Sequence, residues 1–272
     1  MPNPFKKVED FENEINDFLR RNKTFISNQG SRISDYFEMS CYNYIVRYYQ
    51  NHGFELKVKN LIARKFKYKL SPNGYPENFS FFEISCPVDN ENFQMKICFE
   101  IHHNLTVQSG FQDDIYLTPD ISVINKDSII SENDHYLVKN STKKFCYVAN
   151  KDLQTFCEVK NFTPFPELLF NFIGLFNELK SHSLSKGWHI EAPKHLSPSL
   201  MISGKGNIHT DKIKHSLEKR YGVNLFFDLF ENGLINFTAY NSVNINKIGS
   251  LNPKIFSSLS TDAVIDEIDL PF

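Results

Sequence analysis

The first fifty residues repeat apolar and polar positions with the period of a helix. Between residues 5 and 22, apolar side chains fall three or four positions apart, which predicts an amphipathic helix. Those positions are Phe5, Val8, Phe11, Ile15 and Phe18. A second stripe of the same kind runs from Phe37 to Tyr48. Ser34 is a favoured helix cap, and Gly53 is a favoured stop, so we expect a second helix between them.

After Gly53 the chain changes to short runs rich in β-branched and aromatic residues, which predict strands. We place four of them at 55 to 58, 63 to 70, 79 to 85 and 93 to 101. A Pro-Asn-Gly turn at 72 to 74 separates the second from the third. These strands are expected to form an antiparallel meander.

The middle of the chain predicts three further strands. Residues 104 to 118 read as a loop, which leads into a short strand at 119 to 124 that begins with proline. Two more strands are expected at 145 to 149 and 153 to 160. The tight turn Asn150-Lys151-Asp152 between them predicts a β-hairpin.

Strand and helix alternate in the last third of the chain. Pro164 and Pro166 open a helix at 165 to 182 that is apolar on nearly all sides and must be buried. A strand at 199 to 203, a helix at 210 to 221 and a strand at 223 to 230 follow. This order predicts the α/β class, with a mixed central β-sheet flanked by helices. We divide the chain into an N-terminal helical extension (1–30), one compact domain (31–240) and a C-terminal segment with an acidic tail (241–272).

Charge restricts how the chain could bind nucleic acid. The 272 residues carry a net charge of -2, so any such surface must be a local patch. Two basic clusters are candidates, although solvated faces of ordinary elements are the commoner explanation. Their members are Lys57, Lys59, Arg64, Lys65, Lys67 and Lys69 in one, and Lys212, Lys214, Lys219 and Arg220 in the other.

Two compositional features bear on cofactors and location. The five cysteines lie far apart, without zinc-like spacing, and are expected to be free thiols. No apolar run approaches the roughly 18 residues that cross a membrane, and the opening residues turn acidic where a secretory signal would be apolar. A cytoplasmic protein without a membrane partner is expected.

Three charged residues in predicted strands suggest chemistry. Alternate side chains of a strand share a face, so Glu158 and Lys160 point the same way while Val159 points into the core. Asp120, at the start of its own strand, meets Glu158 if the two strands pair. A turn cap at Asp120 and a solvated face at Glu158 are the alternatives. The apolar neighbours of Glu158 favour a central strand, where unpaired charge is costly.

These residues resemble the PD-(D/E)xK nuclease superfamily: Pro119-Asp120, a spacer, then Glu158-x-Lys160 followed by a buried helix. The resemblance implies a restriction-endonuclease-like fold over about residues 30 to 230. It also implies Mg²⁺ or Mn²⁺ held by Asp120, Glu158 and the carbonyl of Val159, with Glu38 on an earlier helix completing the site. Lys160 would orient the attacking water. Glu100 is a weaker alternative to Glu38.

Nuclease activity is expected from these carboxylates and lysine together with that resemblance, and DNA as the substrate follows from the resemblance alone. A restriction or anti-phage assembly is the expected context, because no recognition domain is evident in the sequence. A nuclease-like scaffold that binds nucleic acid or repair proteins without cleaving is the alternative. A homo-oligomer or a larger assembly is compatible with either. His102 and His103 are neighbours on a strand, so they face opposite sides and do not predict a joint metal site.

The acidic C-terminal tip, Asp269-Leu270-Pro271-Phe272, resembles the terminal peptide of bacterial single-stranded-DNA-binding proteins. The resemblance implies a protein partner, with the terminal Phe in an apolar pocket and the acids on Arg and Lys. A frayed tail is the alternative.

Overall fold

The fold is taken from a computed structural model, which describes residues 8–22, 24–26, 32–90, 93–138, 143–180, 195–231 and 234–235. The C-terminal segment 241–272, with the tip Asp269 to Phe272, lies outside the described residues. Among the helices that the structure describes, none has the length and apolar character needed to cross a membrane.

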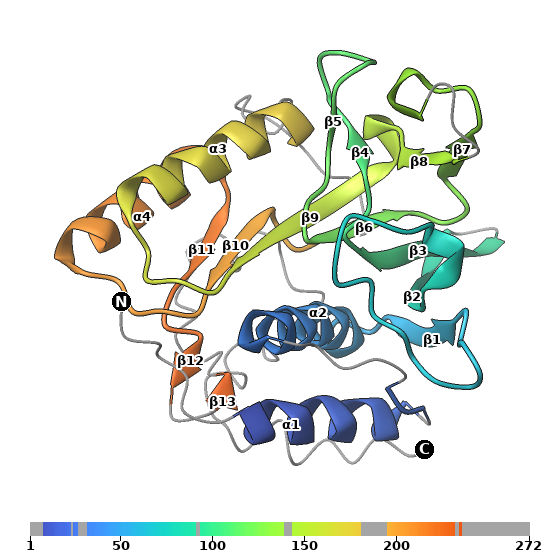
Figure 1. The fold of residues 1–272 in the computed structure, drawn as a ribbon, viewed down its shortest axis with the longest axis horizontal. Helices are drawn as coiled ribbons and strands as arrows, with labels where there is room; N and C mark the ends of the chain where they lie inside the picture. Colours follow the sequence, from blue (N-terminus) through green and yellow to red (C-terminus); the bar gives the residue numbers. More distant parts are fainter. Residues whose placement is uncertain are drawn as a thin grey trace.

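A seven-stranded mixed sheet forms the centre of the molecule (Figure 1). Its spatial order is β1 (Glu55–Lys59), β2 (Phe81–Asn90), β3 (Phe93–His103), β6 (Ile121–Asn125), β9 (Leu153–Lys160), β10 (Ser199–Ile202) and β11 (Asn224–Phe226). Neighbours from β1 to β9 pair antiparallel, whereas β9, β10 and β11 pair parallel. The predicted α/β class is therefore confirmed.

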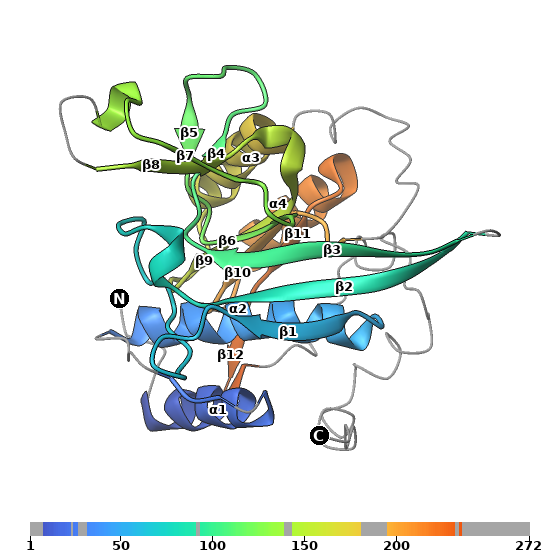
Figure 2. The same cartoon turned by 90° about the vertical axis from the view of Figure 1, so that its right-hand side faces the viewer.

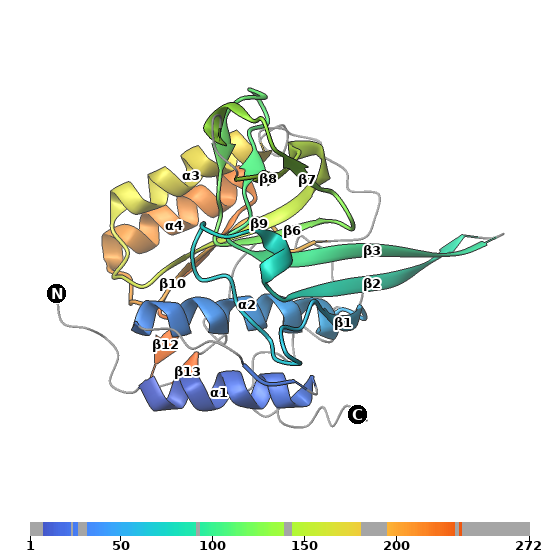
Figure 3. The ribbon, with the colours of Figure 1, turned by 45° about the vertical axis from the view of Figure 1, so that its right-hand side comes forward.

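Helices cover both faces of this sheet (Figures 1 and 3). On one face lies α2 (Ile33–Asn51), with α1 (Val8–Arg21) packed outside it; on the other lie α3 (Pro166–Lys180) and α4 (Ile208–Tyr221). Each face of the sheet has its own apolar core. β9 contributes to both cores, because successive side chains along a strand point to opposite faces. Cys157 and Val159 belong to the α2 side, whereas Phe156 belongs to the α3 side.

The helix ends follow local chemistry. α2 starts one residue before Ser34, so the predicted Ser34 cap is wrong. Arg32 holds the capping position, and its backbone N–H donates to the Asp35 carboxylate over 3.1 Å. α3 begins at Pro166, as proline at a first helical position favours. α4 ends at Gly222, whose φ of 67° lies in the left-handed region that glycine tolerates.

A small second sheet stands above the large one (Figure 2). Its order is β5 (Tyr116–Leu117), β4 (Val107–Gln108), β8 (Phe145–Val148) and β7 (Ile129–Glu132). The prediction of one loop over 104 to 118 is wrong, because β4 and β5 lie within it. The predicted hairpin is also wrong: β8 belongs to the small sheet and β9 to the large one. The 3₁₀ turn Asn150–Asp152 joins the two sheets.

The predicted strand at 63 to 70 does not form. Ala63 and Arg64 adopt left-handed φ values of 49° and 63°, which break an extended run. The segment instead inserts Phe66 and Tyr68 into the core beside α2. The meander therefore has three strands, β1, β2 and β3. Short elements complete the fold: the 3₁₀ turns Pro76–Asn78 and Tyr136–Val138, and the pair β12 (Phe230–Glu231) and β13 (Leu234–Ile235).

Candidate functional site

Three interior strands of the large sheet begin or end at the same place. β6 pairs antiparallel with both β3 and β9, so the end of β3, the start of β6 and the end of β9 lie together. Ile121 is opposite Cys157 in this register. Asp120, one residue before Ile121, is thereby brought next to Glu158, and the pairing that the sequence analysis required is present.

Asp120, Glu158 and Lys160 form one ion-pair cluster at this place. The Lys160 ammonium lies 3.0 Å from an Asp120 carboxylate oxygen and 2.7 Å from a Glu158 carboxylate oxygen. The Val159 backbone N–H donates to the same Asp120 oxygen over 2.7 Å, which fixes the direction of that carboxylate. β9 lies between β6 and β10, inside the sheet. The contact between Glu158 and Lys160 confirms that their side chains share one face of the strand, as predicted.

Glu38 reaches the same region from the second turn of α2. Its carboxylate accepts a hydrogen bond of 2.7 Å from the Asn104 side-chain amide, immediately after β3. The backbone N–H of Asn104 donates to the Asp120 carbonyl over 2.8 Å. One residue thus connects the helix that carries Glu38 to the strand that carries Asp120.

Asn104 and Lys69 also belong to this region, although the sequence pattern did not place either of them at the site. The Asn104 amide also donates to the Lys69 carbonyl, and the Lys69 ammonium donates to the carbonyls of Asn104 and Pro72. Lys69 is buried, which lowers the pKa of its ammonium to about 8. It therefore does not belong to a basic surface patch, and its predicted membership of one is wrong. Asn104 itself adopts a left-handed φ of 46°.

The cluster contains three carboxyl groups, those of Glu38, Asp120 and Glu158, but one ammonium, that of Lys160, and water has little access to them. Burial, and then the Asp120 carboxylate, raise the pKa of Glu158 to about 7 and that of Glu38 to about 8. Burial alone would lower the pKa of Lys160, but the Asp120 and Glu158 carboxylates outweigh it and the pKa rises. Near neutral pH the site therefore holds protons that an added cation could replace.

The side chains of the cluster are not already arranged as a set of metal ligands. Within the described ranges, no group of three or more His, Cys, Asp or Glu side chains is placed to hold a metal ion. The Lys160 ammonium lies between the Asp120 and Glu158 carboxylates and forms an ion pair with each. Carboxylate oxygens are the donors that Mg²⁺ and Mn²⁺ prefer. The residue types therefore fit a divalent cation, provided that Lys160 moves away from at least one carboxylate.

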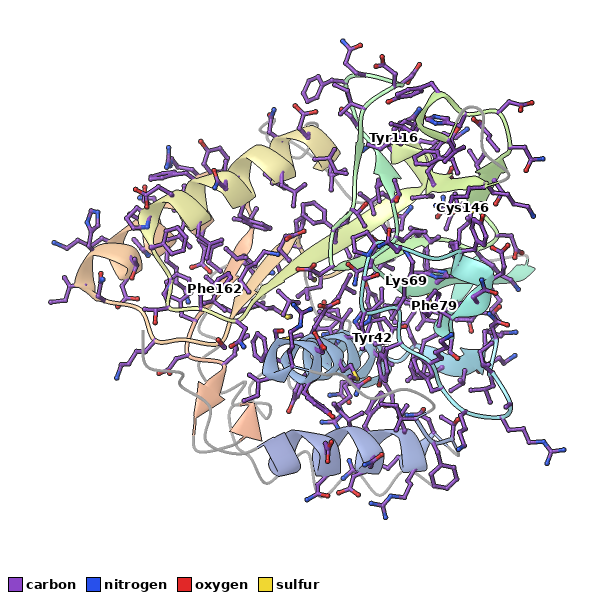
Figure 4. All side chains as sticks on the ribbon, in the orientation of Figure 1. Tyr42, Lys69, Phe79, Tyr116, Cys146 and Phe162 are labelled. Atoms are coloured by element: carbon purple, nitrogen blue, oxygen red, sulfur yellow. The ribbon has the colours of Figure 1, made fainter. Side chains whose placement is uncertain are left out.

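Other charged residues of β3 belong to a separate cluster. Glu100, the weaker alternative to Glu38, pairs with His102 at 2.9 Å, and the His102 ring stacks on Phe81. His103 instead packs against Tyr42, with 4.2 Å between ring centroids. Tyr42 lies on α2 (Figure 4). Burial lowers the pKa of His103 to about 3, so its ring is neutral. The two histidines have separate surroundings, as their positions on one strand predict.

Comparison of the chain with protein-family models, with curated proteins and with solved structures finds no match. The chemistry of the site is thus the basis for a functional proposal. That chemistry consists of partly buried carboxylates from α2, from the residue that leads into β6 and from β9, where strand ends of the mixed sheet meet around one lysine.

Proposed function

We propose that this protein is a metal-dependent nuclease with a restriction-endonuclease-like domain, in which Asp120, Glu158, Lys160 and Glu38 form the active site. One observation carries the proposal: Asp120 and Glu158 come from separate strands and share the Lys160 ammonium at 3.0 and 2.7 Å. Grouping two carboxylates and a lysine that are largely withdrawn from solvent is costly, and stability alone does not require it. Perturbed acids grouped in this way are typical of catalytic sites.

The chain's own residues would divide the work of phosphodiester hydrolysis as follows. Asp120 and Glu158 would hold Mg²⁺ or Mn²⁺ together with the Val159 carbonyl, and Glu38 would support the same ion or a second one. A bound divalent cation supplies Lewis acidity and lowers the pKa of water. Lys160 would orient the attacking water and neutralise charge that develops on the phosphate. The same proposal includes DNA as the substrate and a role in a restriction or anti-phage assembly.

Purified full-length protein incubated with DNA tests the proposal directly. Supercoiled plasmid and circular single-stranded DNA are each incubated with Mg²⁺, with Mn²⁺ and with EDTA. Cleavage with metal and none with EDTA is the expected result. Intact DNA under all metal conditions, from a protein that binds it, would instead favour a scaffold that binds nucleic acid without cutting.

Lys160→Met should separate metal binding from cleavage. Removing the ammonium frees both carboxylates for a cation, so we expect Mn²⁺ affinity to be kept or increased. Cleavage should fall roughly 10²- to 10⁴-fold, because the positive group beside the reacting phosphate is lost. Calorimetric titration with Mn²⁺ and a plasmid assay measure the two effects. Loss of both in a folded variant would contradict the assigned role of Lys160.

Asn104→Gly should weaken metal binding without unfolding the protein. Glycine keeps the left-handed backbone at this position but removes the amide that donates to Glu38. Residues that orient metal ligands contribute about 10- to 100-fold to metal affinity, so at least a tenfold weaker Mn²⁺ affinity is expected. Titration calorimetry measures it.

Asn60→Gly is the matched control for this variant. Asn60 is also left-handed, at φ 51°, and its amide donates to two backbone carbonyls, those of Glu77 and Phe79. Its substitution should cost stability but leave Mn²⁺ affinity unchanged. If both variants bind Mn²⁺ as the parent does, Asn104 does not position Glu38.

A further inference from the structure

An exposed phenylalanine lies immediately beyond the candidate site. Phe162 follows Lys160 by two residues, on the segment that joins β9 to α3 (Figure 4), and is 51% exposed. Two residues span at most about 7 Å, so the Phe162 backbone lies within one nucleotide's length of Lys160. Phe165, on the same segment, is 41% exposed.

The backbone of this segment is fixed on its inner side. The N–H groups of Ser203 and Gly204 donate to the carbonyls of Lys160 and Phe162, at 3.2 and 3.0 Å. A Cβ at Gly204 would lie 2.5 Å from the Phe162 carbonyl oxygen, so only glycine permits this approach. The Ser203 hydroxyl also donates to the Asn161 side chain over 2.9 Å. Phe162 is therefore exposed on a well-anchored backbone.

A single exposed apolar side chain is common on protein surfaces and has no meaning by itself. The position of Phe162 is what distinguishes it, because a substrate with its phosphate at Lys160 would place a nucleotide nearby. The net charge of the chain is a second reason to assign Phe162 a role in nucleic-acid binding. With a net charge of -2 the chain has no overall basic surface, so phosphate contacts are confined to local patches and other interactions must add to the affinity. Stacking of bases on aromatic rings is such an interaction and tolerates any sequence.

We propose, on the basis of the nuclease function proposed above, that Phe162 stacks on an unpaired base beside the scissile phosphate. In a continuous duplex each base face is covered by its neighbours, so a protein ring can stack only on a base that is single-stranded or displaced. The site therefore selects single-stranded nucleic acid, or unpaired nucleotides at ends and junctions, over continuous duplex.

Binding measured without cleavage tests the stacking role. A fluorescent oligothymidine of about 15 nucleotides, and a duplex of equal length, are titrated with full-length protein in EDTA at low salt. Phe162→Ala should bind the single strand about 5- to 150-fold more weakly, which corresponds to about 1–3 kcal/mol for one stacked base. Phe162→Trp should bind it as well as the parent. Affinity for duplex should be weaker throughout and change less than about twofold in either variant.

Phe25→Ala is the matched control, because Phe25 is 60% exposed and its carbonyl accepts a hydrogen bond from the N–H of Phe66, which is not a residue of the cluster. It should bind both oligonucleotides like the parent. Phe162→Trp also reports stacking directly, since base contact quenches indole fluorescence, whereas Phe25→Trp should show no such quenching. Both proteins share the natural Trp188, so their difference isolates the added ring.

The outcomes separate this proposal from the nuclease proposal. Equal single-strand binding by the parent and Phe162→Ala, or parental binding to duplex as tight as to single strand, overturns the stacking proposal even if the protein cleaves DNA. Weakened binding by Phe162→Ala supports it even if no metal activates cleavage, in which case only the nuclease proposal fails.

Discussion

Asp120→Ala is expected to abolish cleavage while leaving the fold intact. The carboxylate is the only group in the cluster that contacts both the Val159 N–H and the Lys160 ammonium, and it faces Glu158 across the paired strands. Without it, a divalent cation loses a ligand and Lys160 loses a partner. The expected loss is roughly 10³-fold or more, because metal chemistry contributes several kcal/mol and each 1.36 kcal/mol is about tenfold. Plasmid cleavage with Mn²⁺ measures it.

The controls for this experiment separate chemistry from folding. Asp120→Asn keeps an acceptor for the Val159 N–H but removes the charge, so it should fold like the parent and still fail to cleave. Glu100→Gln removes a carboxylate of the separate His102 cluster and should cleave normally. An Asp120→Ala protein as active as the parent would end the nuclease proposal.

The elements around the site were predictable where short-range pattern determines structure. Glu158 and Lys160 are two residues apart on one strand, so their shared face was assigned from the period of two alone. α3 and α4 were equally clear, since proline and glycine mark their ends. The pairing of β6 with β9 was only a condition of the hypothesis, and the structure fulfils it.

The small sheet was not predictable, because its pairing is non-local. β4 and β5 are each two residues long, too short to show a period, and β4 pairs with β8 some forty residues later. The turn at 150 to 152 predicted a hairpin because its chemistry is local, whereas Val148 pairs with β4 and β7. Tertiary pairing thus overrode a correct reading of turn residues.

Asn104 shows why the rest of the site was hidden. Its function depends on a left-handed backbone and on partners 66 residues away on α2 and 35 residues away at Lys69. Asparagine tolerates that conformation, but nothing in the sequence around it marks the position. Glu38 was assigned from resemblance, and the structure places it near Asp120 by way of this one amide.

Glu158→Gln is expected to stabilise the metal-free protein at pH 8 but not at pH 5. Glu158 has its pKa raised by burial and by Asp120 from 4.5 to about 7, so between these values the folded state binds more protons than the unfolded state. Stability therefore falls as pH rises through that window. The amide removes this penalty, and Lys160 keeps Asp120 as its partner. A gain on the order of 2 kcal/mol is expected at pH 8, since one pKa unit corresponds to about 1.36 kcal/mol.

Urea unfolding of both proteins at the two pH values, in EDTA, measures the difference. Mg²⁺ or Mn²⁺ should stabilise the parent at pH 8 and much less at pH 5, because protons and cation compete for the same carboxylates. The variant should lose most of that response. Equal stability of the two proteins at pH 8 would mean that Glu158 is well solvated. The cluster would then be an ordinary solvated strand face and not a catalytic site.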